Sequence, residues 1–218
     1  MLDWLRMDWI RAAVDIFLHL DRHLAEVIQS YGAWTYLILT AVIFLETGVV
    51  ATPFLPGDSL LFAAGTFAAL GSLDLALLLV LLTAAAILGD TVNYWIGRKV
   101  GPRVFNEHVR YLKREHLERT RRFYERHGGK TIVLARFVPI VRTFAPFVAG
   151  IGAMSYGRFL AYNVLGGALW VAGFVLAGFF FGTLPVVKEN FSLAILAIVL
   201  LSVTPIVYEY ARQRRRGA

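Results

Sequence analysis

The chain has 218 residues, of which 58% are hydrophobic and 17% charged, and it contains no cysteine. An average soluble domain has about 45–50% apolar and about 25% charged residues, so this composition argues against an ordinary soluble protein, and the lack of cysteine excludes disulfides, cysteine zinc sites and thiol nucleophiles. The net charge of +7 would suit nucleic acid, but the basic residues flank apolar segments instead of interleaving with stacking aromatics, so no nucleic-acid partner is expected.

Residues 1–30 have the pattern of an amphipathic helix. Polar residues such as Arg11 and Asp15 recur every three or four positions, and apolar residues fill the positions between them. We therefore expect a helix that lies in the membrane interface on the outer face instead of spanning it. Asp15, His19 and His23 have a spacing compatible with a metal site, but a solvated polar stripe is the simpler explanation, and neither a metal nor a cofactor is expected.

Residues 31–208 are expected to form a single all-α membrane domain. A helix that crosses a bilayer needs about 20 apolar residues. Three segments meet that requirement and are expected to be full transmembrane helices: 75–97, 159–182 and 190–208. The segment 98–130, with eleven basic and four acidic residues, and the arginine-rich tail 209–218 are expected in the cytoplasm, because basic loops stay inside.

Because these segments lie in the cytoplasm, they determine whether each remaining apolar segment crosses the membrane or returns to the face from which it entered. Residues 131–157 must enter and leave on the cytoplasmic face, and their prolines and arginines indicate a re-entrant hairpin. The apolar segment 33–73 is interrupted near its middle by acidic residues, prolines and a glycine, and it is expected to form a second hairpin that is entered from outside. The predicted fold is an all-α integral membrane protein with three transmembrane helices and two opposed re-entrant helical hairpins in an inverted-repeat arrangement.

Five ionisable residues interrupt the apolar sequence. Glu46 and Asp58 fall in the first hairpin, and Arg136 and Arg142 fall in the second. Since an Asp or Arg at the bilayer centre costs about 2.5–3.5 kcal/mol on insertion scales, these four should face protein or water, and one another. Their charges sum to zero, and broken helices beside them would leave N–H groups that suit an anion. A role confined to joining the two halves is less favoured, because buried pairs stabilise poorly compared with apolar packing. The fifth residue, Asp90, lies near the end of its span, where helix packing or an interface position suffices to explain it.

A series of motifs between residues 31 and 185 surrounds these charges. In chain order they are Glu46-Thr-Gly, Pro53-Phe-Leu-Pro56-Gly57-Asp58, Gly89-Asp90 with Tyr94 and Gly97-Arg98, Arg136 with Pro139 and Arg142-Thr, and Asn163 with Gly167 and Trp170. The series resembles the DedA family (SNARE-associated or VTT type) of bacterial inner-membrane proteins. The resemblance implies dependence on the proton-motive force and the translocation of a polyprenyl phosphate carrier lipid such as undecaprenyl phosphate.

The same resemblance implies that the four hairpin charges are the functional residues. Arg136 and Arg142 are expected to bind the substrate phosphate through charge-assisted hydrogen bonds, which lysine would not reproduce, and Glu46 and Asp58 to couple protons. Six further residues are expected to support the site: Pro56, Gly57, Asp90, Pro139, Asn163 and Trp170. The expected protein is a flippase without enzymatic activity, located in the bacterial cytoplasmic membrane with its C-terminus inside.

Other functions stay open at this point. A proton-coupled antiporter of small cations or drugs would use Glu46 and Asp58 alternately for proton and cation, and a phospholipid translocase or scramblase would take a different lipid. A lipid phosphatase is disfavoured, because all five histidines lie outside the apolar spans and no acidic cluster offers a metal site. Besides lipid phosphate and protons, the expected partners are anionic lipids at the basic segment 98–130, and the oligomeric state is left open.

Overall fold

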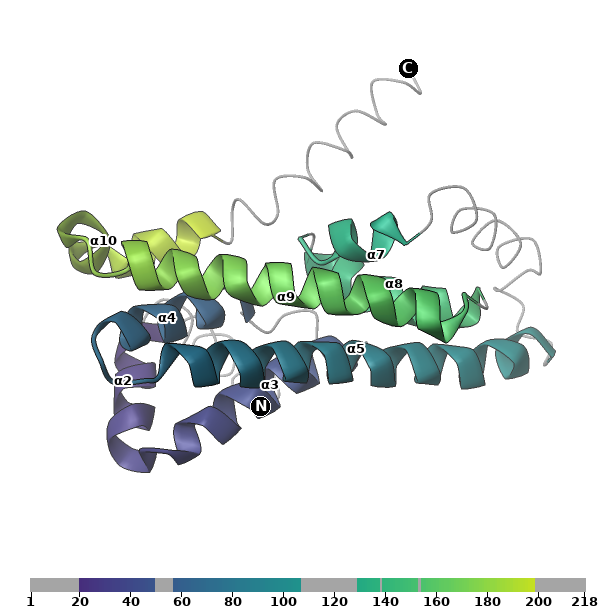
Figure 1. Ribbon diagram of the computed structural model, residues 1–218, viewed down its shortest axis with the longest axis horizontal. Coiled ribbons are helices and arrows are strands. Elements are labelled where there is room, and N and C mark those ends of the chain that lie inside the picture. Colours follow the sequence, from purple (N-terminus) through teal and green to yellow (C-terminus); the bar gives the residue numbers. More distant parts are fainter. Residues whose placement is uncertain (1–19, 50–56, 107–128, 138, 153, 199–218) are drawn as a thin grey trace, which may run out of the picture.

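Two long antiparallel helices run through the protein. The computed structural model describes residues 20–49, 57–106, 129–137, 139–152 and 154–198, and in it α5 spans Leu75–Asn106 and α9 spans Tyr156–Phe181 (Figure 1). Both helices contain stretches of high mean hydropathy, 2.3 and 2.1, and are long and apolar enough to cross a membrane. All regular structure in the described ranges is helical, as expected.

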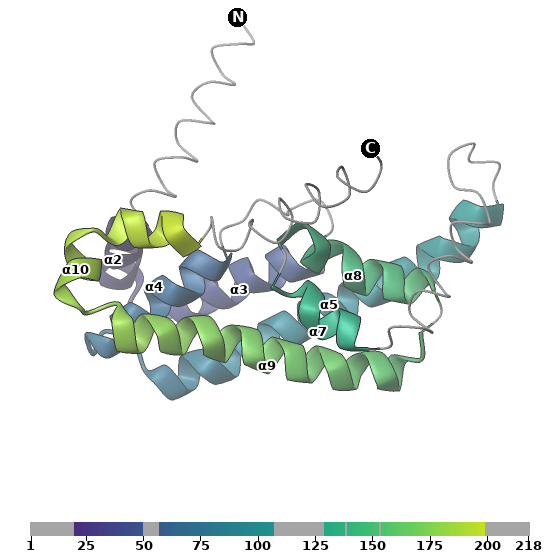
Figure 2. The same ribbon diagram turned by 90° about the horizontal axis from the view of Figure 1, so that it is seen from above.

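A first helical hairpin packs on this pair from the end where α5 begins. Its helix α3 (Trp34–Gly48) packs on α5, and its helix α4 (Gly57–Ala69) packs on α9. Figure 2 shows α3 running inward from that end and α4 returning to it. After α4 the chain turns at Gly71, whose φ of 76° is the left-handed conformation that glycine adopts without strain, and α5 follows.

A second hairpin packs on the same pair from the opposite end. Its helix α7 (Lys130–Ala135) packs on α9, and its helix α8 (Pro139–Ile151) packs on α5 (Figures 1 and 2). The two hairpins therefore correspond: in each, the first helix contacts the long helix that follows it in the chain, and the second helix contacts the other long helix. The end of α3 and the start of α4, like the end of α7 and the start of α8, lie toward the middle of the bundle (Figure 2).

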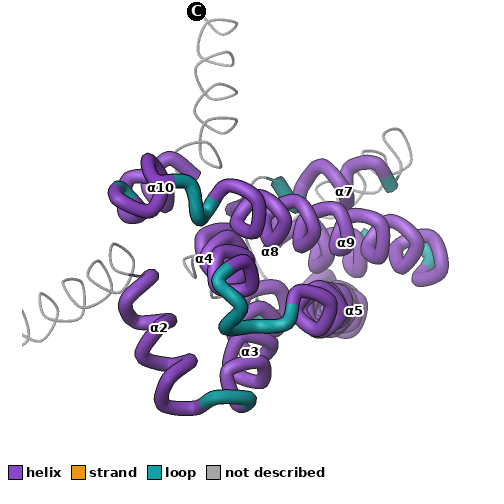
Figure 3. Tube along the Cα trace, turned by 60° about the vertical axis from the view of Figure 1, so that its left-hand side comes forward, coloured by secondary structure: helices purple, strands orange, loops and turns teal. Residues whose placement is uncertain are grey.

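Short elements cover the end where the first hairpin enters. The amphipathic helix α2 (Leu20–Tyr31) buries Leu24 and exposes Arg22 and Glu26, and it contacts α3 and α4 (Figure 3). After α9 come α10 (Pro185–Glu189) and a helical stretch over 191–198. Only part of the expected amphipathic segment 1–30 and of the expected span 190–208 can thus be assigned. Asp15, His19, most of the basic segment 98–130 and the whole tail 209–218 lie outside the described residues.

The outward faces of the long helices are strongly apolar. Val80 and Leu88 of α5 are 67% and 57% exposed, and Leu165 of α9 is 52% exposed. The inward faces form one large apolar cluster around α3, α4, α5 and α9, and a smaller one in which the rings of Tyr94 and Phe159 stack with centroids 4.5 Å apart. An apolar exterior around a packed core is what a lipid environment requires.

The helix boundaries differ from the expected ones in one consequential way. The first long apolar segment was expected to end at residue 97, but α5 continues to Asn106, through Arg98 and Lys99. Charged residues end contact with lipid without ending a helix, because the intrahelical hydrogen bonds do not depend on hydropathy. Asp90 is consequently in the middle of α5.

Candidate functional site: a buried cluster of five charges

Five helical elements bring five ionisable side chains together inside the bundle. Glu46 lies in the last turn of α3, Asp58 in the first turn of α4 and Asp90 in the middle of α5, while Arg136 follows α7 and Arg142 lies in the first turns of α8. All five are buried, with exposed fractions between 0% and 8%. The helix breaks explain how the hairpins supply them, because the charges sit beside the ends of helices that stop in the interior.

The first part of the cluster is centred on Arg142. Its Nη1 donates to Asp58 Oδ1 over 2.7 Å, and its Nη2 donates to Glu46 Oε1. One guanidinium of the second hairpin thus binds both acids of the first. The Glu46 carboxylate lies against Gly57, where a Cβ would clash with it, so a larger residue at the start of α4 would displace this side chain.

The second part is centred on Arg136. Its Nη2 donates to Asp90 Oδ2 and to Asn163 Oδ1, and Asn163 in turn donates through Nδ2 to the Ile87 carbonyl over 3.0 Å. Gly166 leaves room for this arginine, because a Cβ there would lie 3.0 Å from Arg136 Cδ. The counter-ion of Arg136 therefore comes from a long helix and not from the opposite hairpin.

Trp170 lies between the two parts. Its Nε1 donates to Asp58 Oδ1 over 2.8 Å. The Cζ atoms of Arg142 and Arg136 lie 4.5 Å and 5.9 Å from the centroid of its ring, within the range of cation–π attraction. A single indole from α9 thus contacts both arginines and one acid.

Several polar atoms of the cluster have no hydrogen-bond partner among the described residues. They are Nε and Nη1 of Arg136, Nε of Arg142, Oε2 of Glu46 and Oδ1 of Asp90. Buried polar atoms are nearly always hydrogen-bonded in proteins, and a buried charged group left unpaired is costly. Three buried guanidinium nitrogens thus offer N–H donors to an oxygen-bearing anion or to water.

An amide ties the helix breaks to α5. Asn93 donates through Nδ2 to the carbonyl of Thr143 over 2.7 Å and to that of Thr47 over 3.2 Å. Near it the backbones approach closely, since a Cβ on Gly48 would lie 3.3 Å from the Cα of Gly89. Asn93 is not among the site residues expected from the sequence, because a lone amide gives no sign of the two carbonyls that it joins.

The structure brings together most of the residues selected from the sequence. Glu46, Asp58, Arg136 and Arg142 meet, and Asn163 and Trp170 contact them directly. Gly57 contacts Glu46 and Pro139 begins α8, whereas Pro56 lies outside the described residues.

Asp90, one of the residues expected to support the site, is the ion-pair partner of Arg136. The four hairpin charges cancel one another, but with Asp90 included three carboxylates stand beside two guanidinium groups in the described part of the chain. No group of three potential metal ligands occurs in the described part of the chain.

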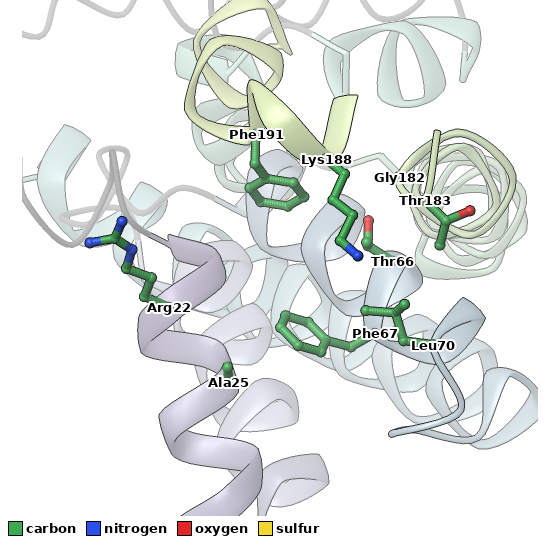
Figure 4. Close-up of a pocket in the computed structure, with 9 residues that line it drawn as sticks. All are labelled: Arg22, Ala25, Thr66, Phe67, Leu70, Gly182, Thr183, Lys188 and Phe191. Carbon is green, nitrogen blue, oxygen red and sulfur yellow. The ribbon is translucent and has the colours of Figure 1, made fainter. Parts of the chain in front are cut away.

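A separate pocket lies away from the cluster, at the end covered by α2 and α10. It has a volume of about 230 Å³ and is lined by Phe67, Leu70 and Phe191 together with the basic residues Arg22 and Lys188. Figure 4 shows the Lys188 side chain reaching toward Thr66. None of the five buried charges lines this pocket.

Comparison with known proteins places the chain in a family. The model of the VTT domain matches residues 55–180. Protein DedA of Escherichia coli is 54% identical over 215 residues, covering 97% of this chain and 98% of the relative. An uncharacterized membrane protein of Mycobacterium tuberculosis is 43% identical, and the inner membrane protein YqjA of Escherichia coli is 33% identical, each over 81% of this chain and 80% of the relative. No solved structure matches. The resemblance inferred from the motifs is thereby confirmed, and the chain is a membrane protein of the DedA family with a VTT domain.

Proposed function

We propose that the protein is a proton-coupled transporter that moves a lipid phosphate of the polyprenyl phosphate type across the bacterial cytoplasmic membrane. The observation that carries the proposal is the pair of buried arginines, Arg136 and Arg142, with three nitrogens that have no hydrogen-bond partner in the described part of the chain. Guanidinium groups recognise phosphate through parallel charge-assisted hydrogen bonds. Transport leaves the lipid chemically unchanged, so no catalytic residue is assigned.

Competition for Arg142 supports a coupling mechanism. Glu46 and Asp58 occupy its two terminal nitrogens, so a phosphate that binds there must displace a carboxylate. Protonation removes the negative charge of a carboxyl group and weakens its hold on the guanidinium. Proton uptake by Glu46 or Asp58 would therefore free Arg142 for the phosphate, and phosphate release would restore the ion pairs.

The arrangement of the hairpins supports transport between the two faces. In the proposed topology they are re-entrant, enter from opposite sides and form inverted repeats with α5 and α9, a design used by many secondary transporters. The third span would be residues 190–208, the basic segment would face anionic lipids in the cytoplasm, and α2 would lie at the outer face.

Reconstitution tests the assignment directly. The purified protein is placed in vesicles that contain polyprenyl phosphate, and the accessibility of the headgroup from outside is followed with and without a pH gradient. Arg136→Lys removes the planar fork, and the loss of a charged hydrogen bond worth about 1.5–3 kcal/mol should slow transport roughly 10- to 100-fold. Glu46→Gln should remove the response to the gradient.

A matched control uses Arg158, an exposed arginine of α9. Arg158→Lys preserves the net charge and should transport at the wild-type rate. If Arg136→Lys and Glu46→Gln move lipid as well as the wild type does, the assignment is wrong.

A second candidate function is a proton-coupled antiporter of small cations or drugs. The excess of carboxylates over guanidinium groups among the described residues favours it, because a net negative charge attracts a cation. In that case ion exchange would occur in vesicles without lipid phosphate and would survive Arg136→Gln. A lipid-phosphate transporter would instead lose its activity with this variant.

A further inference from the structure

The buried cluster has an unbalanced charge. Among the described residues, the ionisable groups that face it are Glu46 from α3, Asp58 from α4, Asp90 from α5, Arg136 from the link after α7 and Arg142 from α8, while α9 contributes neutral Asn163 and Trp170. The neighbouring segments 50–56 and residue 138 contain no ionisable residue in the sequence. With every group ionised, three negative charges stand against two positive ones.

The next titratable groups along α5 do not correct the balance. The Tyr94 hydroxyl donates to the Met154 carbonyl and accepts a hydrogen bond from Arg98, so its proton is already engaged. Arg98 is directed to that hydroxyl and lies two helical turns from Asp90. Neither group therefore offsets the excess negative charge of the described cluster.

A net charge in such a place is expensive. A carboxylate at the bilayer centre costs about 2.5–3.5 kcal/mol even on insertion scales, and a buried charge without a partner tends to be neutralised by proton uptake. Arginine cannot balance the site by losing its proton, because the guanidinium stays charged in proteins. The remaining way to reach neutrality is to protonate one of the three carboxyl groups.

We infer that the cluster holds one resident proton, shared among Glu46, Asp58 and Asp90, and that Asp90 is the residue that makes this proton necessary. Two oxygens have no partner among the described residues and could carry it, Glu46 Oε2 and Asp90 Oδ1. Because the three acids and two arginines interact closely, the proton belongs to the group and not to one member.

The consequence for transport rests on the proposed function. An anion that binds to the two arginines adds a negative charge, and neutrality then requires a further proton on a carboxylate. The site would thus take up a proton from water with each phosphate monoanion and release it when the anion leaves. Without Asp90, the site would hold no resident proton, and the only proton would be the one taken up when the anion binds.

Infrared spectroscopy of the full-length protein tests the inference without any lipid substrate. A protonated carboxylic acid has a carbonyl stretching band that ionised carboxylates lack, and difference spectra between wild type and variants isolate it. At neutral pH, in sodium-free buffer, the wild type should show the band of one buried carboxylic acid. Asp90→Asn, Glu46→Gln and Asp58→Asn should each abolish it, because two acids then balance two arginines. Arg142→Gln should double it.

The control variant is Asp74→Asn, at an exposed position where the side chain accepts a hydrogen bond from the Leu77 N–H over 2.7 Å, and asparagine caps a helix as well as aspartate does. It should keep the wild-type band. Absence of the band in the wild type, or its persistence in Asp90→Asn, overturns the inference. Circular dichroism verifies folding of each variant, and if Asp90→Asn does not fold, Glu46→Gln and Asp58→Asn still decide the count. Failure of lipid transport would leave this result unchanged, so the two proposals fail separately.

Discussion

Replacing Arg142 with an apolar side chain tests the organisation of the buried cluster most severely. The residue is 3% exposed and its guanidinium binds both Glu46 and Asp58, so Arg142→Met removes the cation of two buried acids, which then stay charged without a partner or take up a proton. Removing one partner of a buried ion pair costs about 3–5 kcal/mol. Since about 1.4 kcal/mol is a factor of ten, the ratio of folded to unfolded protein should fall roughly 10²- to 10⁴-fold.

The assay is reversible unfolding in mixed micelles at neutral pH, followed by circular dichroism. The triple variant Arg142→Met, Glu46→Gln, Asp58→Asn keeps only the balanced pair of Arg136 and Asp90, and most of the lost stability should return. Acidic pH should also reduce the loss in the single variant, because protonated acids no longer need a cation. Arg158→Met, at an exposed position, controls for the loss of an arginine. A single variant as stable as the wild type, or a triple variant no more stable than the single one, refutes the reasoning.

Three smaller changes probe the packing around the site, each measured by the same unfolding assay. Gly178→Ala places a Cβ against the backbone of α4 and should destabilise by about 1–3 kcal/mol, whereas Gly173→Ala, in the same helix with open space around it, should be neutral or stabilise by about 0.5–1 kcal/mol. Equal effects of the two would contradict the close contact between α4 and α9. Trp170→Phe keeps an aromatic ring but removes the hydrogen bond to Asp58, and should cost about 1.5–3 kcal/mol. Tyr94→Phe removes a hydroxyl that donates to a backbone carbonyl and should cost about 0.5–1.5 kcal/mol; an unchanged stability would show that this bond contributes nothing.

The meeting of the four hairpin charges could be expected from the sequence because the bilayer makes lone charges expensive. Any fold that buried Glu46, Asp58, Arg136 and Arg142 had to bring acids and arginines together. The hydropathy of the sequence does not predict which acid pairs with which arginine, because the pairing depends on helix register. Arg142 takes both acids since the end of α3 and the start of α4 face each other across the break in the first hairpin.

The partner of Asp90 could not be predicted from the sequence. Its place near the end of the apolar run at residue 97 says nothing of the helix, which continues to Asn106 and has Asp90 at its middle. Its pairing with Arg136 further depends on Asn163 and on the glycines of α9, which shape the space for the arginine. Such features come from tertiary contacts between segments that are far apart in the chain.

The separation of the paired residues along the chain constrains how the protein is made. Arg142 follows Glu46 by 96 residues and Asp58 by 84, and Arg136 follows Asp90 by 46. During synthesis the first hairpin is complete long before its cation exists, so its acids cannot reach their final state in lipid at that stage. The acids of this hairpin must then be protonated when it enters the bilayer, or the hairpin must stay near the membrane surface until the second hairpin emerges. The first hairpin therefore reaches its final position only after the second half has inserted. In a chain cut between the two hairpins, Glu46 and Asp58 would have no arginine to pair with.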